Sequence, residues 1–311
     1  MLPVKPLAVT PLARQCTNVL QTTYGTAPVG DLLRALAETG GGDEAQSIFQ
    51  AMALRKAALL PAVKERLRTG TKYEKYMLTK FLRYCPWPET LPELMALASG
   101  ATQHWLPRQG ALHALGALGD KSAGPAVAEI LRQPKCSTGV QLAVIAALAR
   151  MQYREAADVI RPFTQSADIH QRLYAARALA EFGEPVDEAF LLASLENKDY
   201  VVRQEACGAL GAAGVTGKLG LVAVNDSHEA VRAAAAQAVL EHGMRGQPVA
   251  AKVEILRDAL PDADRLTTTW IVRSMLAQGG DAGRAFVEEL ATHDDRLGER
   301  SRAYLILAAG R

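Results

Sequence analysis

The residues with the most distinct chemistry in this chain are basic side chains gathered between Arg55 and Arg83. Nine lysines and arginines stand there against Glu65 and Glu74, a local balance of +7. Basic side chains on one surface can hold phosphate groups or the carboxylates of an acidic protein. We therefore expect either an anionic partner at this segment or, as the alternative, an ordinary solvated helix surface.

Within this segment, the stretch KYEKYMLTKFLRY places basic and aromatic residues at helical spacing. Lys72, Tyr76, Lys80 and Arg83 recur at i+4 and i+3, so they share one face of a helix. With Lys75 they form the candidate basic patch. The ligands that such a patch could bind are an acidic protein segment or nucleic acid, and both alternatives stay open.

Residues for metal or nucleophilic chemistry are few. His228 is followed by Glu229, but one such pair does not supply a metal-ligand set. The four cysteines are widely separated and lack zinc-binding spacing, so we expect reduced thiols. No phosphate loop, nucleophile elbow or HExxH motif occurs. We expect His228 to serve at a helix start, and we predict no catalytic residue, no metal, no cofactor and no small-molecule substrate.

An eleven-residue phrase recurs about every 31 residues and predicts the helices that position these side chains. Its clearest copies begin at Arg108, Arg172 and Arg203. Counted from that leading residue, small or apolar side chains stand at +3, +6, +7 and +10, and glycine follows at +11. This spacing predicts a helix with one buried stripe and a glycine end.

Helix-end residues support this register. Serine or aspartate, which cap helix N-termini, stands four residues before several leading positions. These residues are Ser137, Asp168, Asp199, Asp264 and Asp295. Gln152 replaces the glycine at +11 of the copy that begins at Gln141, so we expect a different turn there. Shorter amphipathic stretches between the phrases predict a first helix for each pair.

The predicted fold class is all-α: a right-handed α-solenoid of about nine antiparallel helix pairs. The composition agrees, with 49% hydrophobic but only 5% aromatic residues, as expected for closely approaching helices. We expect residues 1–311 to form one domain. Its parts are an N-terminal capping segment at 1–29 with a helix from Thr10, divergent basic repeats at 30–104, regular repeats at 105–243, and C-terminal repeats with a cap at 244–311.

The phrases beginning at Arg108, Arg172 and Arg203 resemble the HEAT repeat, in particular the short bacterial form related to phycobilin lyases. The resemblance extends over residues 105–243 and more weakly to residue 311. It implies that the second helix of each pair lines the concave side of a curved stack and that the ligands are usually proteins.

Helical geometry predicts which residues this surface shows. If +3, +6, +7 and +10 are buried, then +1, +5 and +8 lie on the exposed side. The resulting partner-binding residues are Gln109, His113, Leu142, Leu173, Arg177, Gln204, Gln237 and Arg273. Because the side chains on the middle of this surface are small, neutral and partly apolar, we expect it to bind a protein or peptide.

The predicted function is a non-enzymatic scaffold or adaptor, cytoplasmic and without a membrane partner, since no long apolar run occurs. One alternative resembles the HEAT-like alkylpurine DNA glycosylases, whose sites use aromatic residues in a basic cleft. Trp87, Trp105 and Trp270 are available for that role, but we expect them to pack beneath turns. A second alternative is a phycobilin-lyase-like or chaperone role. The HEAT-like deoxyhypusine hydroxylases use several His-Glu dipeptides to bind metal. This chain has one such dipeptide, His228-Glu229.

Overall fold

The computed structural model of this chain describes residues 24–40, 42–100, 104–133, 136–215, 218–219, 222, 226–238, 241–242, 272, 275–276, 280–293, 298, 301–303 and 305–306. The regular elements within these ranges are helices, and no strand occurs among them. The predicted all-α class is confirmed. The right-handed path and the nine pairs stay predictions.

Contacts divide the chain into two compact units, one built around Leu12–Phe182 and one around Gly183–Leu305. Each is described by itself, and the single-domain organisation stays a prediction. The helices of the first unit are α2 (Val29–Glu38), α3 (Gly42–Ala53), α4 (Lys56–Thr69), α5 (Lys72–Tyr84), η1 (Pro88–Thr90), α6 (Leu91–Ser99), α7 (Trp105–Leu118), η2 (Lys121–Ala123), α8 (Gly124–Glu129), η3 (Ile130–Arg132), α9 (Thr138–Arg150), η4 (Arg154–Ala156), α10 (Ala157–Ile160), η5 (Arg161–Gln165) and α11 (Ile169–Phe182). The expected N-terminal helix from Thr10 lies outside the described residues.

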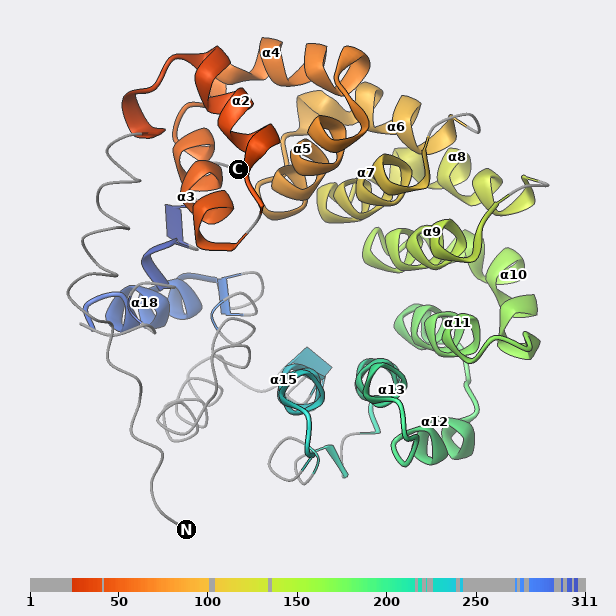
Figure 1. Cartoon of the computed structure of the whole chain (residues 1–311). Coiled ribbons are helices and arrows are strands. Elements are labelled where there is room, and N and C mark those ends of the chain that lie inside the picture. Colours follow the sequence, from red (N-terminus) through yellow and green to blue (C-terminus); the bar gives the residue numbers. More distant parts are fainter. Residues whose placement is uncertain are drawn as a thin grey trace. The chain divides into compact units, whose positions relative to one another are not determined.

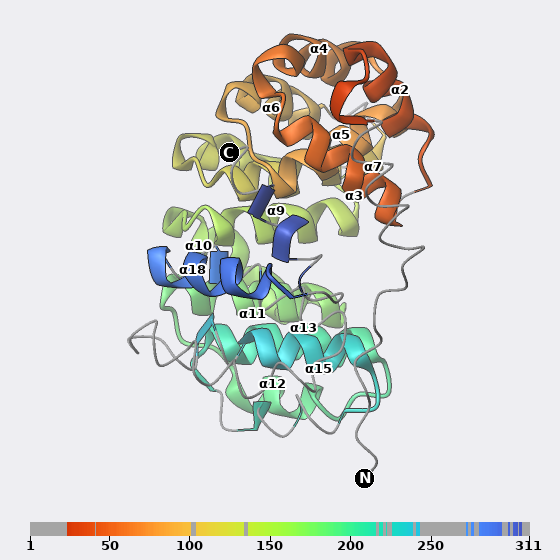
Figure 2. The same ribbon diagram turned by 90° about the vertical axis from the view of Figure 1, so that its left-hand side faces the viewer.

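Helix pairs in the first unit form two layers (Figure 1). The second helices α5, α7, α9 and α11 contact one another in that order, and α4, α6 and α8 form the layer of first helices. Figure 2 shows α9 and α11 lying one after the other. Each first helix also packs on its own second helix, as the repeat phrase requires.

Proline has different effects in the first helices. Pro61 lies inside the 14-residue helix α4, and Pro125 stands in the first turn of α8, where its missing N–H costs nothing. Pro162 stands where α10 gives way to the 3₁₀ helix η5, because proline cannot donate to the preceding turn.

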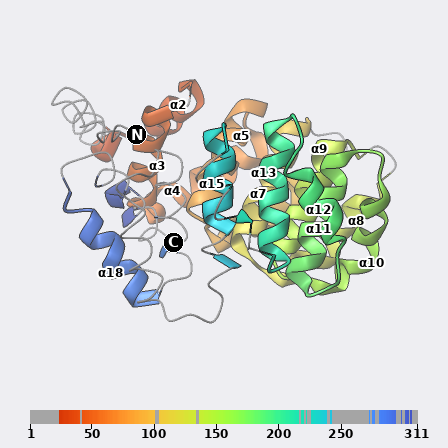
Figure 3. The same cartoon turned by 90° about the horizontal axis from the view of Figure 1, so that it is seen from below.

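The second unit contains α12 (Glu188–Ser194), α13 (Tyr200–Ala212), α15 (Glu229–Ala238) and α18 (Gly280–Leu290) among its described helices. Helix α12 packs on α13, and α13 packs on α15 (Figure 3). The same pairing of a first and a second helix is therefore repeated here.

The buried stripe predicted from the phrase is confirmed. Leu115, Leu179 and Leu210, each at +7, expose 2% or less of their surface. The alanines at +3 and +6 of the same helices expose no more than 1%. The side chains between layers are thus small or aliphatic, which allows close helix contact.

The helix starts also follow the register. Asp168 accepts a hydrogen bond from the backbone N–H of His170, and Asp199 accepts one from Val201. Ser137 is the N-cap of α9 but makes no capping hydrogen bond through its side chain. Asp264 and Asp295 lie outside the described residues.

Histidine takes the capping role where serine or aspartate is missing. The Nδ1 atom of His104 accepts from the backbone N–H of Leu106, and Nδ1 of His228 accepts from Ala230. The expected helix-start role of His228 is confirmed. Its imidazole also stacks on the ring of Tyr200 at a centroid distance of 3.7 Å.

Glycine ends the phrases in the left-handed conformation, with φ of 68° at Gly119, 85° at Gly183 and 77° at Gly214. The expected different turn at Gln152 is wrong, because this residue adopts φ of 53°. Backbone hydrogen bonds explain why: Tyr153 N–H donates to Leu148 O just as Val215 N–H donates to Leu210 O. The turn is set by these bonds, and glutamine is held in a conformation that costs it free energy.

The leading arginine of the phrase donates hydrogen bonds to the turn that precedes its helix. Arg172, Arg203 and Arg232 each donate through Nη1 to the carbonyl oxygen six residues earlier. Arg108 instead donates through Nε to the carbonyl oxygen of Ala98, ten residues earlier in the last turn of α6. These carbonyl groups lie between the two helices of a pair, where helical bonding cannot satisfy them.

Arg203 also joins two consecutive pairs. Its Nε and Nη2 atoms donate to Asp226 Oδ2 and Oδ1 at 2.8 and 2.9 Å, with both side chains largely buried. Asp226 in turn accepts from the backbone N–H of His228 at the start of α15. The hydrogen bonds from Arg203 hold the pKa of Asp226 below its usual range.

We predict that Arg203→Met lowers the free energy of unfolding by about 3 kcal/mol, because it leaves the Asp226 carboxylate without its partner. Arg203→Lys should recover only part of the loss, since an ammonium cannot form the two parallel bonds. Urea denaturation at neutral pH measures both. Arg154→Met, at an exposed position, is the control. Equal stability of the Arg203 and Arg154 variants would contradict the bridging role.

A second prediction concerns the turn at Gln152. Gln152→Gly should be more stable than Gln152→Ala by about 1 kcal/mol, because only glycine adopts a left-handed φ without strain. Both variants lack the side chain, so the comparison isolates the backbone. At Gln109, inside α7, the order should reverse. The same order at both positions, measured by thermal unfolding, would refute the left-handed turn.

Candidate partner-binding face

The basic segment from Arg55 to Arg83 is largely neutralised on α4. Lys64 and Arg68 both pair with Glu93, whose carboxylate is buried against α4. Other ion pairs join Lys56 to Glu89 and Arg66 to Glu74. The local balance of +7, which already counts Glu74, is therefore reduced further by Glu89 of η1 and Glu93 of α6, which lie outside the counted stretch.

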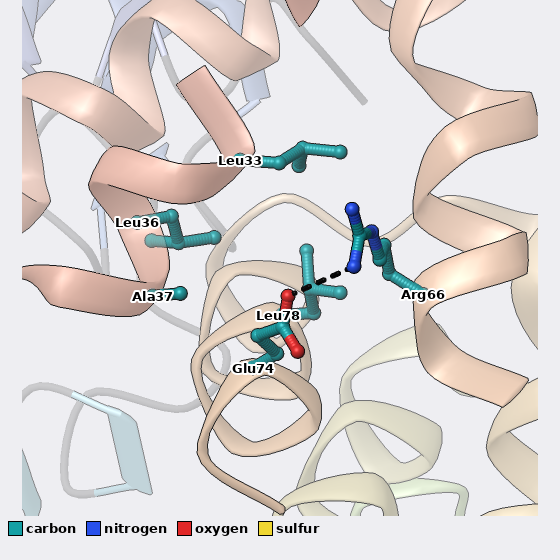
Figure 4. A pocket seen from close by; sticks show the side chains of 6 residues that line it. All are labelled: Leu33, Leu36, Ala37, Arg66, Glu74 and Leu78. Atoms are coloured by element: carbon teal, nitrogen blue, oxygen red, sulfur yellow. Dashed lines mark hydrogen bonds and ion pairs between the residues drawn. The ribbon is translucent and has the colours of Figure 1, made fainter. Parts of the chain in front are cut away.

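Arg66 and Glu74 also line a small hollow between α2, α4 and α5 (Figure 4). Their ion pair of 3.3 Å spans it, and the remaining lining is aliphatic, from Leu33, Leu36 and Leu78. About 190 Å³ of empty space is less than an ordinary ligand site needs. The hollow does not provide a site for a small-molecule substrate.

The basic patch on α5 follows the register of the regular repeats. Thr71 caps α5 through a capping box, as His104 caps α7, so Lys75 takes the leading position of Arg108. The side chains at +3, +6 and +7 of α5 are buried, as in the clear copies, and so is the side chain at +10, which is buried in only one of those copies. These are Leu78, Phe81, Leu82 and Cys85.

The expected exposure of Lys75 is therefore wrong, because only 9% of its surface reaches solvent. The leading position lies beside the turn between layers, where Arg108 exposes 4%. Tyr76, Lys80 and Arg83 instead take positions +1, +5 and +8 and are half-buried, and Lys72 is exposed at the start of the helix. The patch is thus the continuation onto α5 of the face predicted for the regular repeats.

On α7 and α9, the predicted residues Gln109, His113 and Leu142 are half-buried at +1 and +5. The Gln109 side chain donates through Nε2 to the carbonyl oxygen of Gly139 at 3.3 Å, which joins α7 to α9. The structure therefore brings the three residues onto one surface of adjacent second helices.

On α7, α9, α11 and α13, position +8 does not belong to this face, in contrast to Arg83 at +8 of α5. Gly116, Ala149, Ala180 and Gly211 are all buried there. A Cβ on Gly116 would lie 3.0 Å from the Cα of Ala147, and one on Gly211 would lie 2.6 Å from the Cβ of Ala238. Both alanines stand at +6 of the next second helix. Position +8 therefore faces the neighbouring second helix of the stack, which approaches too closely for a larger side chain.

Leu173, predicted to bind a partner, exposes only 1% of its surface, so its expected exposure is also wrong. Position +1 lies at the border with a neighbouring second helix, as the bond from Gln109 to Gly139 shows. A polar residue at +1 reaches across this border, whereas leucine is enclosed within it.

The accessible line of the face runs through +1, +5 and +9. Arg150 at +9 of α9 is exposed, and Glu181 at +9 of α11 is half-buried. Sequence reasoning missed both residues. A signal was present in the sequence: +8 is small in the clear copies, while +9 is charged at Arg150, Glu181 and Glu241.

His113 lies between two arginines on this face. Burial lowers its pKa to about 3, and the positive charges of Arg83 on α5 and Arg150 on α9 act in the same direction. The imidazole is therefore neutral at physiological pH. The cations nearest to it are the two guanidinium groups.

On α11, the predicted residue Arg177 pairs with Glu181 at 3.1 Å. Glu181 also accepts from Nε2 of Gln152 at 3.5 Å. The basic character of the face thus ends at α11, where the arginine is matched by a carboxylate.

In the second unit, Gln204 on α13 and Gln237 on α15 are half-buried at +1 and +5. Gln237 donates to Glu241 Oε1 at 2.7 Å, again joining +5 to +9. Arg273 lies outside the described residues, so its place on a face stays a prediction.

The tryptophans differ in their environments. Trp87 is fully buried and makes an edge contact with Phe81 at 5.0 Å, so the expected packing is confirmed. Trp105 exposes 54% of its surface at the start of α7, and the packing expected for it is wrong. Trp270 lies outside the described residues.

Among the described residues, no three His, Cys, Asp or Glu side chains are grouped as metal ligands would be. Within the same part of the chain, no helix combines the length and apolarity needed to cross a membrane. The buried thiol of Cys207 has a pKa raised to about 12, mainly by burial, which disfavours the thiolate.

Comparison with solved structures supports the fold. The complex of CpcE and CpcF of phycocyanin lyase from Nostoc sp. PCC7120 is similar, with 22% identity and a TM-score of 0.56 over 76% of this chain and 95% of that chain. An engineered protein has 17% identity and a TM-score of 0.37 over 95% of each chain. Human deoxyhypusine hydroxylase in complex with glycerol has 16% identity and a TM-score of 0.29 over 96% of this chain and 97% of that chain.

No curated protein matches the sequence. Residues 135–211, which include the copies beginning at Gln141, Arg172 and Arg203, match the family of HEAT repeats. Helix pairs of the same construction precede and follow these residues. Residues 135–211 of this chain are therefore HEAT repeats, and the fold is HEAT-like.

Proposed function

We propose that this chain is a non-enzymatic scaffold or adaptor that binds a protein partner on the second-helix face of its first unit. We define this face by the accessible residues of α5, α7, α9 and α11. They are Tyr76, Lys80, Arg83, Gln109, His113, Leu142, Ala146, Arg150, Arg177 and Glu181.

The observation that carries this proposal is the row of adjacent second helices that present half-buried polar and aliphatic side chains. Ala146 and Leu142 contribute apolar area, and Gln109 and His113 together contribute hydrogen-bonding groups. Surfaces of this mixed kind, repeated along stacked helices, suit an extended protein ligand. The residues Gln204 and Gln237 extend the proposal to the second unit.

A nucleic-acid partner is the less favoured reading. Binding to a phosphate backbone draws on a continuous row of cations. Here the cations of α4 are paired with carboxylates, and Arg177 is paired with Glu181. The face offers a few cations in one place and neutral residues beyond them.

A lyase-like role is the second candidate, and the fold likeness to the CpcE and CpcF complex supports it. That structure is a complex of two chains, so the likeness is also compatible with binding to a partner chain. A bilin pigment added to this protein should then change its absorption spectrum on binding. An unchanged spectrum at saturating pigment would remove this candidate.

The partner-binding proposal predicts that bulk added at the centre of the face abolishes capture of the partner. Ala146→Trp on α9 should lose a protein that the wild type captures from an extract of the source cells, because the indole would fill the contact surface. Mass spectrometry of the eluted proteins measures this. Treatment of the extract with nuclease should leave the capture unchanged.

The matched control is Ala126→Trp on α8, an exposed alanine in the first helix of the same pair. It should capture the partner as the wild type does. Circular dichroism and thermal unfolding confirm that both variants are folded. The proposal is wrong if the two variants capture alike, or if nuclease removes the captured protein.

A further inference from the structure

The two helix layers of the first unit differ in how their cations are paired. Helix α5 carries four basic residues and one acidic, and α7 and α9 carry one arginine each and no acidic residue. The single carboxylate of α5, Glu74, is used by the capping box and by its ion pair with Arg66. In the first-helix layer, by contrast, Glu89 and Glu93 pair with Lys56, Lys64 and Arg68 of α4.

On α5, α7 and α9, most of the lysines and arginines that reach solvent lie on the second-helix face. Lys75 and Arg108 are buried at leading positions, and Arg108 is used by Ala98 O and Gln133 Oε1. Lys80, Arg83 and Arg150 remain on the face. Neither Lys80 nor Arg83 forms an ion pair with any described residue.

Arg83 of α5 and Arg150 of α9 both lie close enough to His113 of α7 to act on its charge. The Cδ atom of Arg150 lies 3.4 Å from where a Cβ on Gly116 would stand, so the arginine stem covers this glycine. On the other side, the Nε atom of Arg83 is buried and makes no hydrogen bond to any described residue. His113, neutral and half-buried, lies near both guanidinium groups.

We propose that Arg83 and Arg150, with Lys80 beside them, hold the carboxylates of an acidic, amphipathic protein segment that lies across α5, α7 and α9. The proposal deepens the partner-binding function, on which it rests. Guanidinium groups bind carboxylates through parallel hydrogen bonds, and an unsatisfied buried Nε gains most from such a partner. The apolar side of the segment would contact Leu142 and Ala146, which lie on the same face.

A protein segment fits this arrangement better than nucleic acid. Apart from Arg177, which is paired with Glu181 on α11, the cations of the face lie on α5 and α9, so a phosphate backbone that continued along the face would gain no net positive charge at α11. An acidic segment needs carboxylates at only two or three positions. Its remaining side chains can be neutral or apolar, as the exposed parts of α7 and α9 are.

The test measures binding of a fluorescein-labelled helical peptide to the full chain. The peptide has glutamate on one face and leucine on the other. Fluorescence anisotropy at physiological salt measures binding. We expect the glutamine version of the peptide to bind at least about tenfold more weakly, because it loses the charge-assisted bonds. Arg83→Gln combined with Arg150→Gln should weaken glutamate-peptide binding to a similar extent.

The matched control combines Lys121→Gln with Arg154→Gln, which removes two exposed cations from the first-helix layer. It should bind the glutamate peptide as the wild type does. A further variant, Arg83→Glu with Arg150→Glu, should prefer a lysine version of the peptide. That gain of binding cannot arise from misfolding.

The acidic-partner proposal is overturned by equal binding of the glutamate and glutamine peptides, by equal loss in the control variant, or by tighter binding of a duplex oligonucleotide. These results are separable from failure of the partner-binding function. If Ala146→Trp still abolishes capture of the natural partner while the peptides bind alike, then the face binds a protein whose recognition does not depend on carboxylates.

Discussion

The arrangement of several repeats depends on a leading arginine. In the copies that begin at Arg172, Arg203 and Arg232, its guanidinium group binds a carbonyl oxygen in the turn between the two helices of a pair, and these oxygens have no partner within a helix. Arg203 adds a second connection, because it also binds Asp226 at the entrance to the next second helix. This residue therefore connects the helices within a pair and also joins two pairs. A lysine, such as Lys75 at the leading position of α5, lacks the planar fork that reaches both acceptors.

A second constraint, the close approach of consecutive second helices, decides which residues are available for binding. Where Gly116 meets Ala147, and where Gly211 meets Ala238, the contact leaves no room for a Cβ. On these helices the side at +8 is covered by this contact, and the accessible residues stand at +1, +5 and +9. The binding surface is consequently narrower than an isolated helix would offer.

These two constraints explain how a nearly neutral protein can present a basic surface. On α4, the lysines and arginines are matched by the carboxylates of η1, α5 and α6. On α5 and α9, the stripe and the interhelical contacts use small and apolar residues, and Glu74, in the first turn of α5, is the single carboxylate of these two helices. The positive charge is thus displayed beside neutral, partly apolar residues, which favours an amphipathic protein ligand over an extended polyanion.

The sequence by itself determined the helical class, the stripe at +3, +6, +7 and +10 and most helix ends, because these follow from local periodicity and from capping chemistry. It did not determine that Gln152 would adopt the glycine turn, since the backbone bonds of the preceding helix impose that conformation. Nor could it show that Lys75 and Leu173 are enclosed or that +8 is covered. Those outcomes depend on how closely a neighbouring helix approaches, a distance that residues far apart in the sequence set together through packing.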